Sequence, residues 1–229
     1  MKKVILSLGG SLIIPDTVRT VFLRQFRNLI LSKVEEGYEF VIFAGGGSTA
    51  RIYQQGLEDI MGEDASNDAK DWVGIYSSWV NARLVLEMFR EHAREEIIID
   101  PTVPVQTDKP IVIGGGWKPG WSTDYDAVQV AVNNGYDKVI NLSNITYVYD
   151  KDPNKFDDAV KITDIAWPAF RKIVGDEWTP GLSMPFDPIA SKVAEEHGIE
   201  VIVANGQNVE NVQAILEGDE FIGTRIHAA

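Results

Sequence analysis

Residues 40–51 read FVIFAGGGSTAR, a run of apolar residues that ends in three glycines. Such a run is typical of a strand that is buried on both faces, as in a parallel sheet covered by helices. The arrangement occurs twice more, because residues 4–8 run into Gly9-Gly10-Ser11 and residues 110–113 run into Gly114-Gly115-Gly116. Ligands of open α/β sheets bind beyond the carboxyl ends of the strands, so we expect the three glycine turns to share one site.

The rest of the chain alternates between strand and helix patterns. This alternation predicts an α/β fold, an αβα sandwich around a mostly parallel central sheet, in a single domain of 229 residues. Asp16 is a plausible N-cap of the first long helix, and Gly37 stands where its C-cap belongs. Further strands are expected at residues 97–99, 138–142 and 199–204, and helices at residues 18–34, 49–60, 68–92, 124–133, 186–197 and 209–216.

Charge and composition disfavour several classes of function. The formal net charge of -13 opposes binding to a nucleic-acid backbone. The chain contains no cysteine, and His92, His197 and His227 show no metal-ligand spacing, so no metal site built from side chains is expected. The apolar run at the N-terminus is interrupted by Gly9-Gly10, and no cleavage-site pattern follows it. We therefore expect a cytoplasmic protein without a membrane span.

Several phosphate groups are the ligand that best fits three glycine turns at one sheet edge. Glycine lets the backbone approach an anion closely, and the start of a following helix adds positive potential. The chain contains neither a G-x-x-x-x-G-K-[ST] motif nor a G-x-G-x-x-G motif after the first strand. Walker-type NTPases and NAD-binding Rossmann enzymes are therefore disfavoured.

Arg51 and Asp71 are the charged residues that we consider for substrate contact. Arg51 follows Gly47 by four residues and lies near the start of a helix, where a guanidinium can hold a phosphate bidentately. A solvated surface arginine is the alternative. Asp71 stands near an expected helix start, where a carboxylate either caps the helix or accepts hydrogen bonds from ribose hydroxyls. The bare sequence favours the cap.

Two polar segments follow strands later in the chain. The first, WKPGWSTD at residues 117–124, leads into a helix, and its hydroxyls can cap that helix or hold phosphate. Its two tryptophans can stack on a base or pack between lobes. The second comprises Ser143-Asn144 and the stretch from Tyr149 to Pro153, which either seats a nucleoside or simply forms turns.

In chain order, these segments resemble the amino acid kinase family, and within it the archaeal-type UMP kinases. The marks of the resemblance are Gly9-Gly10-Ser11, Gly45-Gly46-Gly47 with Arg51, Asp71 with Gly74-Ile75 and Asn81-Ala82, the loop from Gly114 to Asp124, Ser143-Asn144, Tyr149 to Pro153, and Asp187-Pro188 with Lys192. The resemblance implies an acceptor lobe at about residues 1–120 and an ATP nucleoside lobe at about residues 121–229. It also implies transfer of the γ-phosphoryl group of ATP, with Mg²⁺, to UMP, and a homo-oligomer that is typically a hexamer.

The resemblance assigns a role to each matching residue. The catalytic residues would be Arg51 and Gly10. The residues that bind UMP would be Gly46, Asp71, Gly116, Trp117, Trp121, Ser122 and Thr123. The residues that bind ATP would be Gly9, Gly10, Ser11, Gly47, Arg51, Ser143, Asn144, Tyr149 and Asp152.

Two departures from the family pattern leave alternatives open. Ser7 stands where many members carry a lysine, and residues 144–149 read NITYVY where the family usually has NVDGVY. One alternative is a kinase of the same fold that acts on an acylated amino acid, a carbamate or isopentenyl phosphate. No histidine accompanies the turn at Gly45-Gly46-Gly47, as we would expect for isopentenyl phosphate. The other alternative is a nucleotide-binding regulator or storage protein that has lost catalysis.

Overall fold

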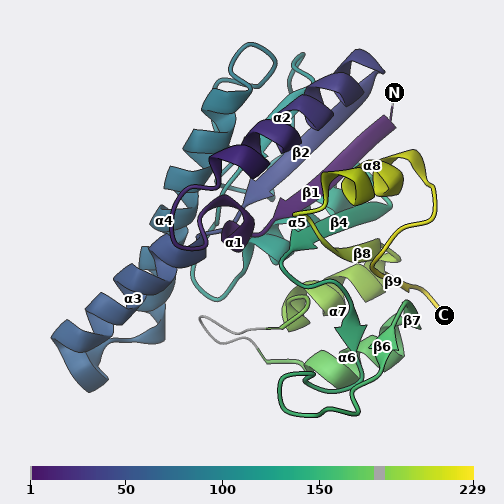
Figure 1. Cartoon of the computed structure of the whole chain (residues 1–229). Coiled ribbons are helices and arrows are strands. Elements are labelled where there is room, and N and C mark those ends of the chain that lie inside the picture. The colour runs from purple at the N-terminus through teal and green to yellow at the C-terminus, as the bar shows by residue number, and fades with distance from the viewer. Residues whose placement is uncertain (1, 178–183) are drawn as a thin grey trace.

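The computed structural model describes residues 2–177 and 184–229 and is built around a seven-stranded sheet (Figure 1). The strand order is β3-β2-β1-β4-β8-β9-β7. The first five strands in this order are parallel, β9 is antiparallel to β8, and β7 is parallel to β9. Their bounds are β1 Lys2–Leu8, β2 Tyr38–Ala44, β3 Ile111–Gly114, β4 Lys138–Ser143, β7 Asp164–Ala166, β8 Glu200–Asn205 and β9 Thr224–His227.

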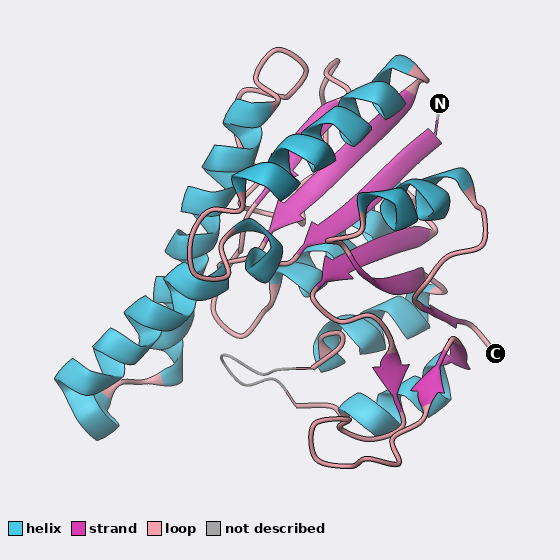
Figure 2. Ribbon diagram, in the orientation of Figure 1, coloured by secondary structure: helices cyan, strands magenta, loops and turns pink. Residues whose placement is uncertain are grey.

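Helices cover both faces of the sheet, which gives the three layers of an αβα sandwich (Figure 2). On one face lie α1 Gly10–Ile13, α2 Thr20–Glu35, α4 Asn67–Met88 and α8 Val209–Glu217. On the other face lie α5 Thr123–Asn134, α6 Trp167–Val174 and α7 Pro188–His197. The helix α3 Gly47–Met61 packs against α4, and the two extend beyond the sheet. A short hairpin of β5 Val148–Tyr149 and β6 Lys161–Ile162 completes the fold.

Alternation along the central strands explains the two cores. Leu6 and Ile42 belong to the core under α2, whereas their neighbours Ile5 and Val41 belong to the core under α5. Both sets are buried, so the central parts of these strands carry apolar residues on both faces, as a parallel sheet covered on both faces requires. The predicted α/β fold with a mostly parallel sheet is confirmed.

Three local predictions are wrong. Residues 97–99 form no strand but only an isolated bridge between Ile98 and Gly114. Asp16 is not an N-cap, because α2 begins at Thr20 and is preceded by Arg19. Asp71 is not a cap either, because it lies one turn inside α4, where Ser66 is the N-cap and accepts a hydrogen bond from the backbone N–H of Ala69.

Candidate functional site

The first two glycine turns are packed against each other at the carboxyl edge of the sheet. The backbone N–H of Gly45 donates to the carbonyl of Leu8 at 3.0 Å. A β-carbon on Gly10 would lie 2.0 Å from the backbone nitrogen of Gly47, so a side chain has no room there. Gly47 itself has a φ of 64°, a conformation that favours glycine. The expected meeting of these turns is thus observed, and it depends on glycine.

Asn81 fixes the second turn from the side of α4. Its side-chain amide donates to the carbonyls of Gly45 and Gly46, at 2.8 and 3.0 Å. The asparagine is buried, so both bonds are formed away from water. The sequence pattern includes Asn81 but assigns it no role, because its contacts with residues 35 and 36 positions away are not visible in sequence.

A cavity of about 500 Å³ opens beside these turns, between the starts of α3 and α5 and the first half of α4. Ten of its lining residues are among the predicted site residues: Ser11, Gly46, Gly47, Arg51, Asp71, Gly116, Trp121, Ser122, Thr123 and Asn144. Five lining residues were not predicted: Ala50, Gln54, Gly74, Ile75 and Ser78. Most of these five lie on α4 or α3 one turn from a predicted residue, so helical periodicity was the signal that could have found them.

The cavity holds one cation and one carboxylate among its lining residues, Arg51 and Asp71. Arg51 is exposed, which leaves its guanidinium accessible to a ligand. Asp71 is almost buried, and its Oδ2 accepts a 2.7 Å hydrogen bond from the backbone N–H of Gly120. Asp71 therefore ties α4 to the loop at residues 116–121 while it lines the cavity.

Other contacts with α4 and α5 shape the same loop. The N–H of Gly116 donates to the Oγ of Ser78 at 2.8 Å, and the indole N–H of Trp79 donates to the Gly116 carbonyl at 2.7 Å. At the end of the loop Ser122 is the N-cap of α5, accepting from the N–H of Tyr125 at 3.2 Å. The loop is thus held at its start and its end, and the capping role that we left open belongs to Ser122.

The tryptophans of the loop stack on one another. The ring of Trp121 lies 4.1 Å from that of Tyr125 and 6.3 Å from that of Trp117, and Lys118 places its Nζ 3.8 Å from the Trp117 ring centroid. Trp121 lines the cavity, but Trp117 does not belong to its lining. Packing of the loop onto α5 is the role that the structure shows for Trp117.

Two acidic residues lie near each other at this edge, the half-buried Asp124 and the buried Asp187. The hydroxyl of Ser7 donates to Oδ1 of Asp124 at 2.7 Å. Burial raises the pKa of Asp124 to about 6, and the charge of Asp187 adds to the rise, while hydrogen bonds from Ser7 and Asn141 oppose it. Burial also raises the pKa of Asp187, which is the N-cap of α7 and accepts from the N–H of Ala190.

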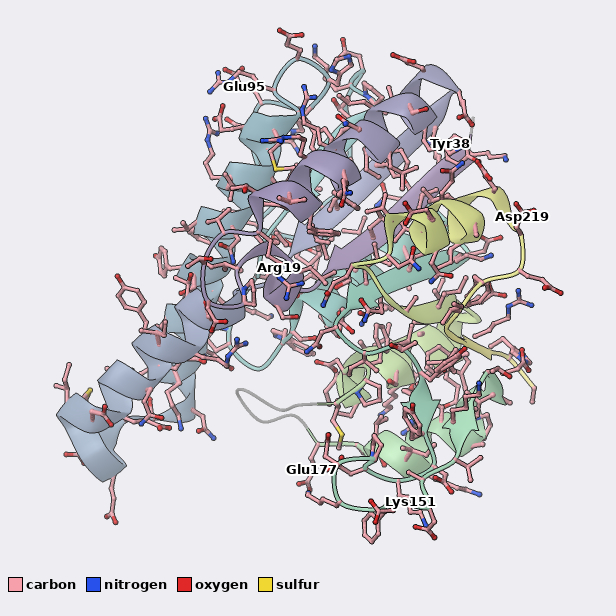
Figure 3. The ribbon with its side chains drawn as sticks, viewed as in Figure 1. Arg19, Tyr38, Glu95, Lys151, Glu177 and Asp219 are labelled. Carbon is pink, nitrogen blue, oxygen red and sulfur yellow. The ribbon has the colours of Figure 1, made fainter. Side chains whose placement is uncertain are left out.

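The residues expected to hold the ATP nucleoside are more widely spaced. Ser143 ends β4 beside Gly9 and accepts a 3.1 Å hydrogen bond from the N–H of Ile145. Tyr149 ends β5, and Asp152 lies in the following loop, where it accepts from the N–H of Asn154. Neither Tyr149 nor Asp152 lines the cavity. Figure 3 shows Lys151, their neighbour, at the lower edge of the molecule, away from the glycine turns.

The described part of the chain has neither a clustered metal site nor a membrane-spanning helix. Within residues 2–177 and 184–229, no three histidine or acidic side chains are grouped so that they could hold a metal ion. No helix in that part of the chain is both long and apolar enough to cross a membrane.

Comparison with known proteins gives consistent matches. The model of the amino acid kinase family matches residues 2–205. A uridylate kinase of Methanocorpusculum labreanum is 30% identical over 98% of this chain and 95% of its own length, and one of Methanobrevibacter smithii is 29% identical over 98% of both. The crystal structure of uridylate kinase from Archaeoglobus fulgidus is 28% identical and matches with a TM-score of 0.80, over 99% of this chain and 100% of its own. With its sheet, its interlocked glycine turns and these matches, the chain belongs to the amino acid kinase family.

Proposed function

We propose that this chain is a UMP kinase that transfers the γ-phosphoryl group of ATP to UMP and releases UDP and ADP. The observation that carries the proposal is that Arg51 and Asp71 line one cavity beside two glycine turns. UMP offers a phosphate and a ribose diol, which are the partners that a guanidinium and a carboxylate bind best. Relatives matched over nearly their full length are named uridylate kinases, which supports the same acceptor.

The acceptor would lie with its ribose at Asp71 and its phosphate toward Arg51. The carboxylate of Asp71 is held at the cavity wall, where its Oδ2 accepts a hydrogen bond from Gly120, and ribose hydroxyls would donate to the same carboxylate. The walls provided by Gly116, Trp121 and Thr123 would enclose the nucleoside. The same-fold alternatives lack the ribose that would use Asp71 in this way.

The donor phosphates would lie along the glycine turns. Gly47 begins α3, a helix of 15 residues whose positive N-terminal end suits an anion, and Ser11 follows the first turn. Gly9 and Gly10 keep the backbone of the first turn close to this point. The described residues offer no cluster of three metal-binding side chains, so Mg²⁺ would be held chiefly by the phosphates of ATP, whose negative charge it would offset.

The reaction requires positioning more than a nucleophilic side chain. An oxygen of the UMP phosphate attacks the γ-phosphorus of ATP, the bond to the β–γ bridging oxygen breaks, and ADP leaves. The attacking phosphate is an anion, so no general base is needed. Arg51, the one cation among the lining residues, would reduce repulsion between the two phosphates. Holding them in line is worth about 7–11 kcal/mol in favourable cases.

Some finer predictions accompany this proposal. Ser143, Asn144, Tyr149 and Asp152 would bind the ATP nucleoside, in a lobe that begins at about residue 121. A homo-oligomer, typically a hexamer, and a cytoplasmic location remain expected. The exposed apolar side chains of α4, Trp72, Tyr76, Val80 and Leu84, support self-association, because an apolar stripe of this kind usually meets a partner.

The deciding experiment measures UDP formation from ATP, Mg²⁺ and UMP. Wild type is compared with Arg51→Ala and Asp71→Ala, and UMP with CMP, dUMP, an acylated amino acid, carbamate and isopentenyl phosphate. We expect turnover of UMP, a large loss in Arg51→Ala and a raised KM for UMP in Asp71→Ala.

Other results would point elsewhere. Turnover of another acceptor with none of UMP would leave the fold and reject the acceptor. Binding of ATP and UMP by calorimetry, with no UDP formed by folded protein, would support a regulator.

A further inference from the structure

Asp126 is a fully buried carboxyl group in the first turns of α5. Its Oδ2 accepts a 3.1 Å hydrogen bond from the backbone N–H of Trp117, nine residues earlier. Its Oδ1 is also buried and has no hydrogen-bond partner among the residues that the structure describes. The sequence prediction gave Asp126 no role.

The fold itself does not favour a carboxyl group at this position. Burial raises the pKa of Asp126 well above its ordinary value, the hydrogen bond from the Trp117 N–H opposes the rise, and the nearby Asp187, Asp124 and Asp100 add to it. A buried oxygen without a partner destabilises a fold, and apolar residues of similar size usually suit such a position better. Ala127, Val128 and Val130 of the same helix belong to the core, so this part of α5 is buried.

The hydrogen bond that Asp126 accepts lies at the start of the loop at residues 116–121. Trp117 lies near the start of this loop and bonds to Asp126. Gly120 lies near its end and bonds to Asp71. Trp121, which follows Gly120, lines the cavity and stacks on Trp117. A shift at Trp117 would therefore move Trp121 and the N–H that Asp71 uses.

We propose that Asp126 is a positioning residue that holds Trp117 and so sets the shape of the cavity wall against which the acceptor would lie. It acts through the loop and does not contact the acceptor itself. This inference rests on the proposed function in one respect only, the identification of the acceptor as UMP. The position of the loop is a property of the free protein.

The test uses the isosteric pair Asp126→Leu and Asp126→Asn. Asparagine keeps an oxygen that accepts from the Trp117 N–H, whereas leucine has none. We expect Asp126→Leu to raise the KM for UMP roughly 3- to 10-fold, as loss of one such hydrogen bond implies, with the KM for ATP unchanged. Asp126→Asn should restore the wild-type KM. The Tm of Asp126→Leu should equal or exceed that of the wild type.

Amide hydrogen exchange supplies a readout that needs no substrate. Peptides that contain residues 116–121 should exchange faster in Asp126→Leu and at the wild-type rate in Asp126→Asn. Unchanged exchange in Asp126→Leu would overturn the proposal, and so would an asparagine variant as impaired as the leucine variant. A wild-type protein that fails to use UMP, but shows the expected exchange pattern, would reject the acceptor and leave the positioning role standing.

Discussion

Ser7 and Asp124, 117 residues apart in sequence, are joined by a 2.7 Å hydrogen bond between the hydroxyl of the serine and Oδ1 of the aspartate. The bond links the end of β1 to the start of α5, directly behind the first glycine turn. Serine supplies a donor but no positive charge where the family pattern has a lysine. Burial raises the pKa of Asp124 to about 6, and the hydrogen bond from Ser7 only partly opposes this rise.

That pKa predicts a specific dependence of stability on pH. The value in the folded state lies above the unfolded value of 3.8, so the stabilising contribution is present at low pH and is lost as the pH rises through about 6. Asp124→Asn removes this contribution. Relative to wild type, the variant should gain roughly 1 kcal/mol in free energy of unfolding between pH 5 and pH 7.5. Urea unfolding at the two pH values measures the difference, and an identical pH dependence in both proteins would contradict the assignment.

Gly10→Ala should damage both stability and activity. The added β-carbon would meet backbone atoms of Gly47 and Gly45, which cannot move without separating the two turns. We expect a loss of about 3 kcal/mol in the free energy of unfolding. Gly56→Ala is the matched control, because nothing lies within 4 Å of its β-carbon and alanine suits a helix interior. It should stabilise by about 0.5–1 kcal/mol, as thermal unfolding would show.

The elements that the sequence predicted correctly are those that a local pattern of apolar residues and glycines determines. The apolar runs before Gly9 and Gly45 identified β1 and β2 because a strand buried on both faces is apolar along most of its length. Residues 97–99 are equally apolar, yet they lie beside the short edge strand β3 and pair at a single point. An apolar run indicates that a segment is buried. It does not show that an adjacent strand is long enough to pair with that segment.

The site was predicted in part, for a related reason. Residues in the glycine turns and in the loop before α5 follow strand ends, so parallel topology brings them together. The contacts of Asn81 and Ser78 depend instead on where α4 crosses that edge, which no spacing encodes. β7, α6 and β9 were likewise not predicted. All three are short, and the strands β7 and β9 pair with each other across a long stretch of sequence.

Arg51 offers a test of how the phosphate is held. If two N–H groups of its guanidinium bind one phosphate, Arg51→Lys should lose one of the two charge-assisted hydrogen bonds. Arg51→Ala should lose both. We expect kcat/KM for UMP to fall roughly 10-fold in the lysine variant and about 100-fold or more in the alanine variant. Arg24→Ala, an exposed arginine on α2, is the control and should keep wild-type kinetics. Equal losses in the two Arg51 variants would argue against bidentate binding.

The exposed face of α4 gives a prediction about assembly. Tyr76 and Val80 lie one turn apart with 58% and 65% of their surface exposed, on a helix whose opposite face lines the cavity. If a second copy of the chain covers this face, a buried glutamate without a partner would oppose the contact strongly. Val80→Glu should then lower the mass measured by light scattering, while Val21→Glu, equally exposed on α2, should leave it unchanged. Because α4 also carries Asp71, dissociation should raise the KM for UMP as well. An unchanged mass in Val80→Glu would place the interface of any oligomer elsewhere on the molecule.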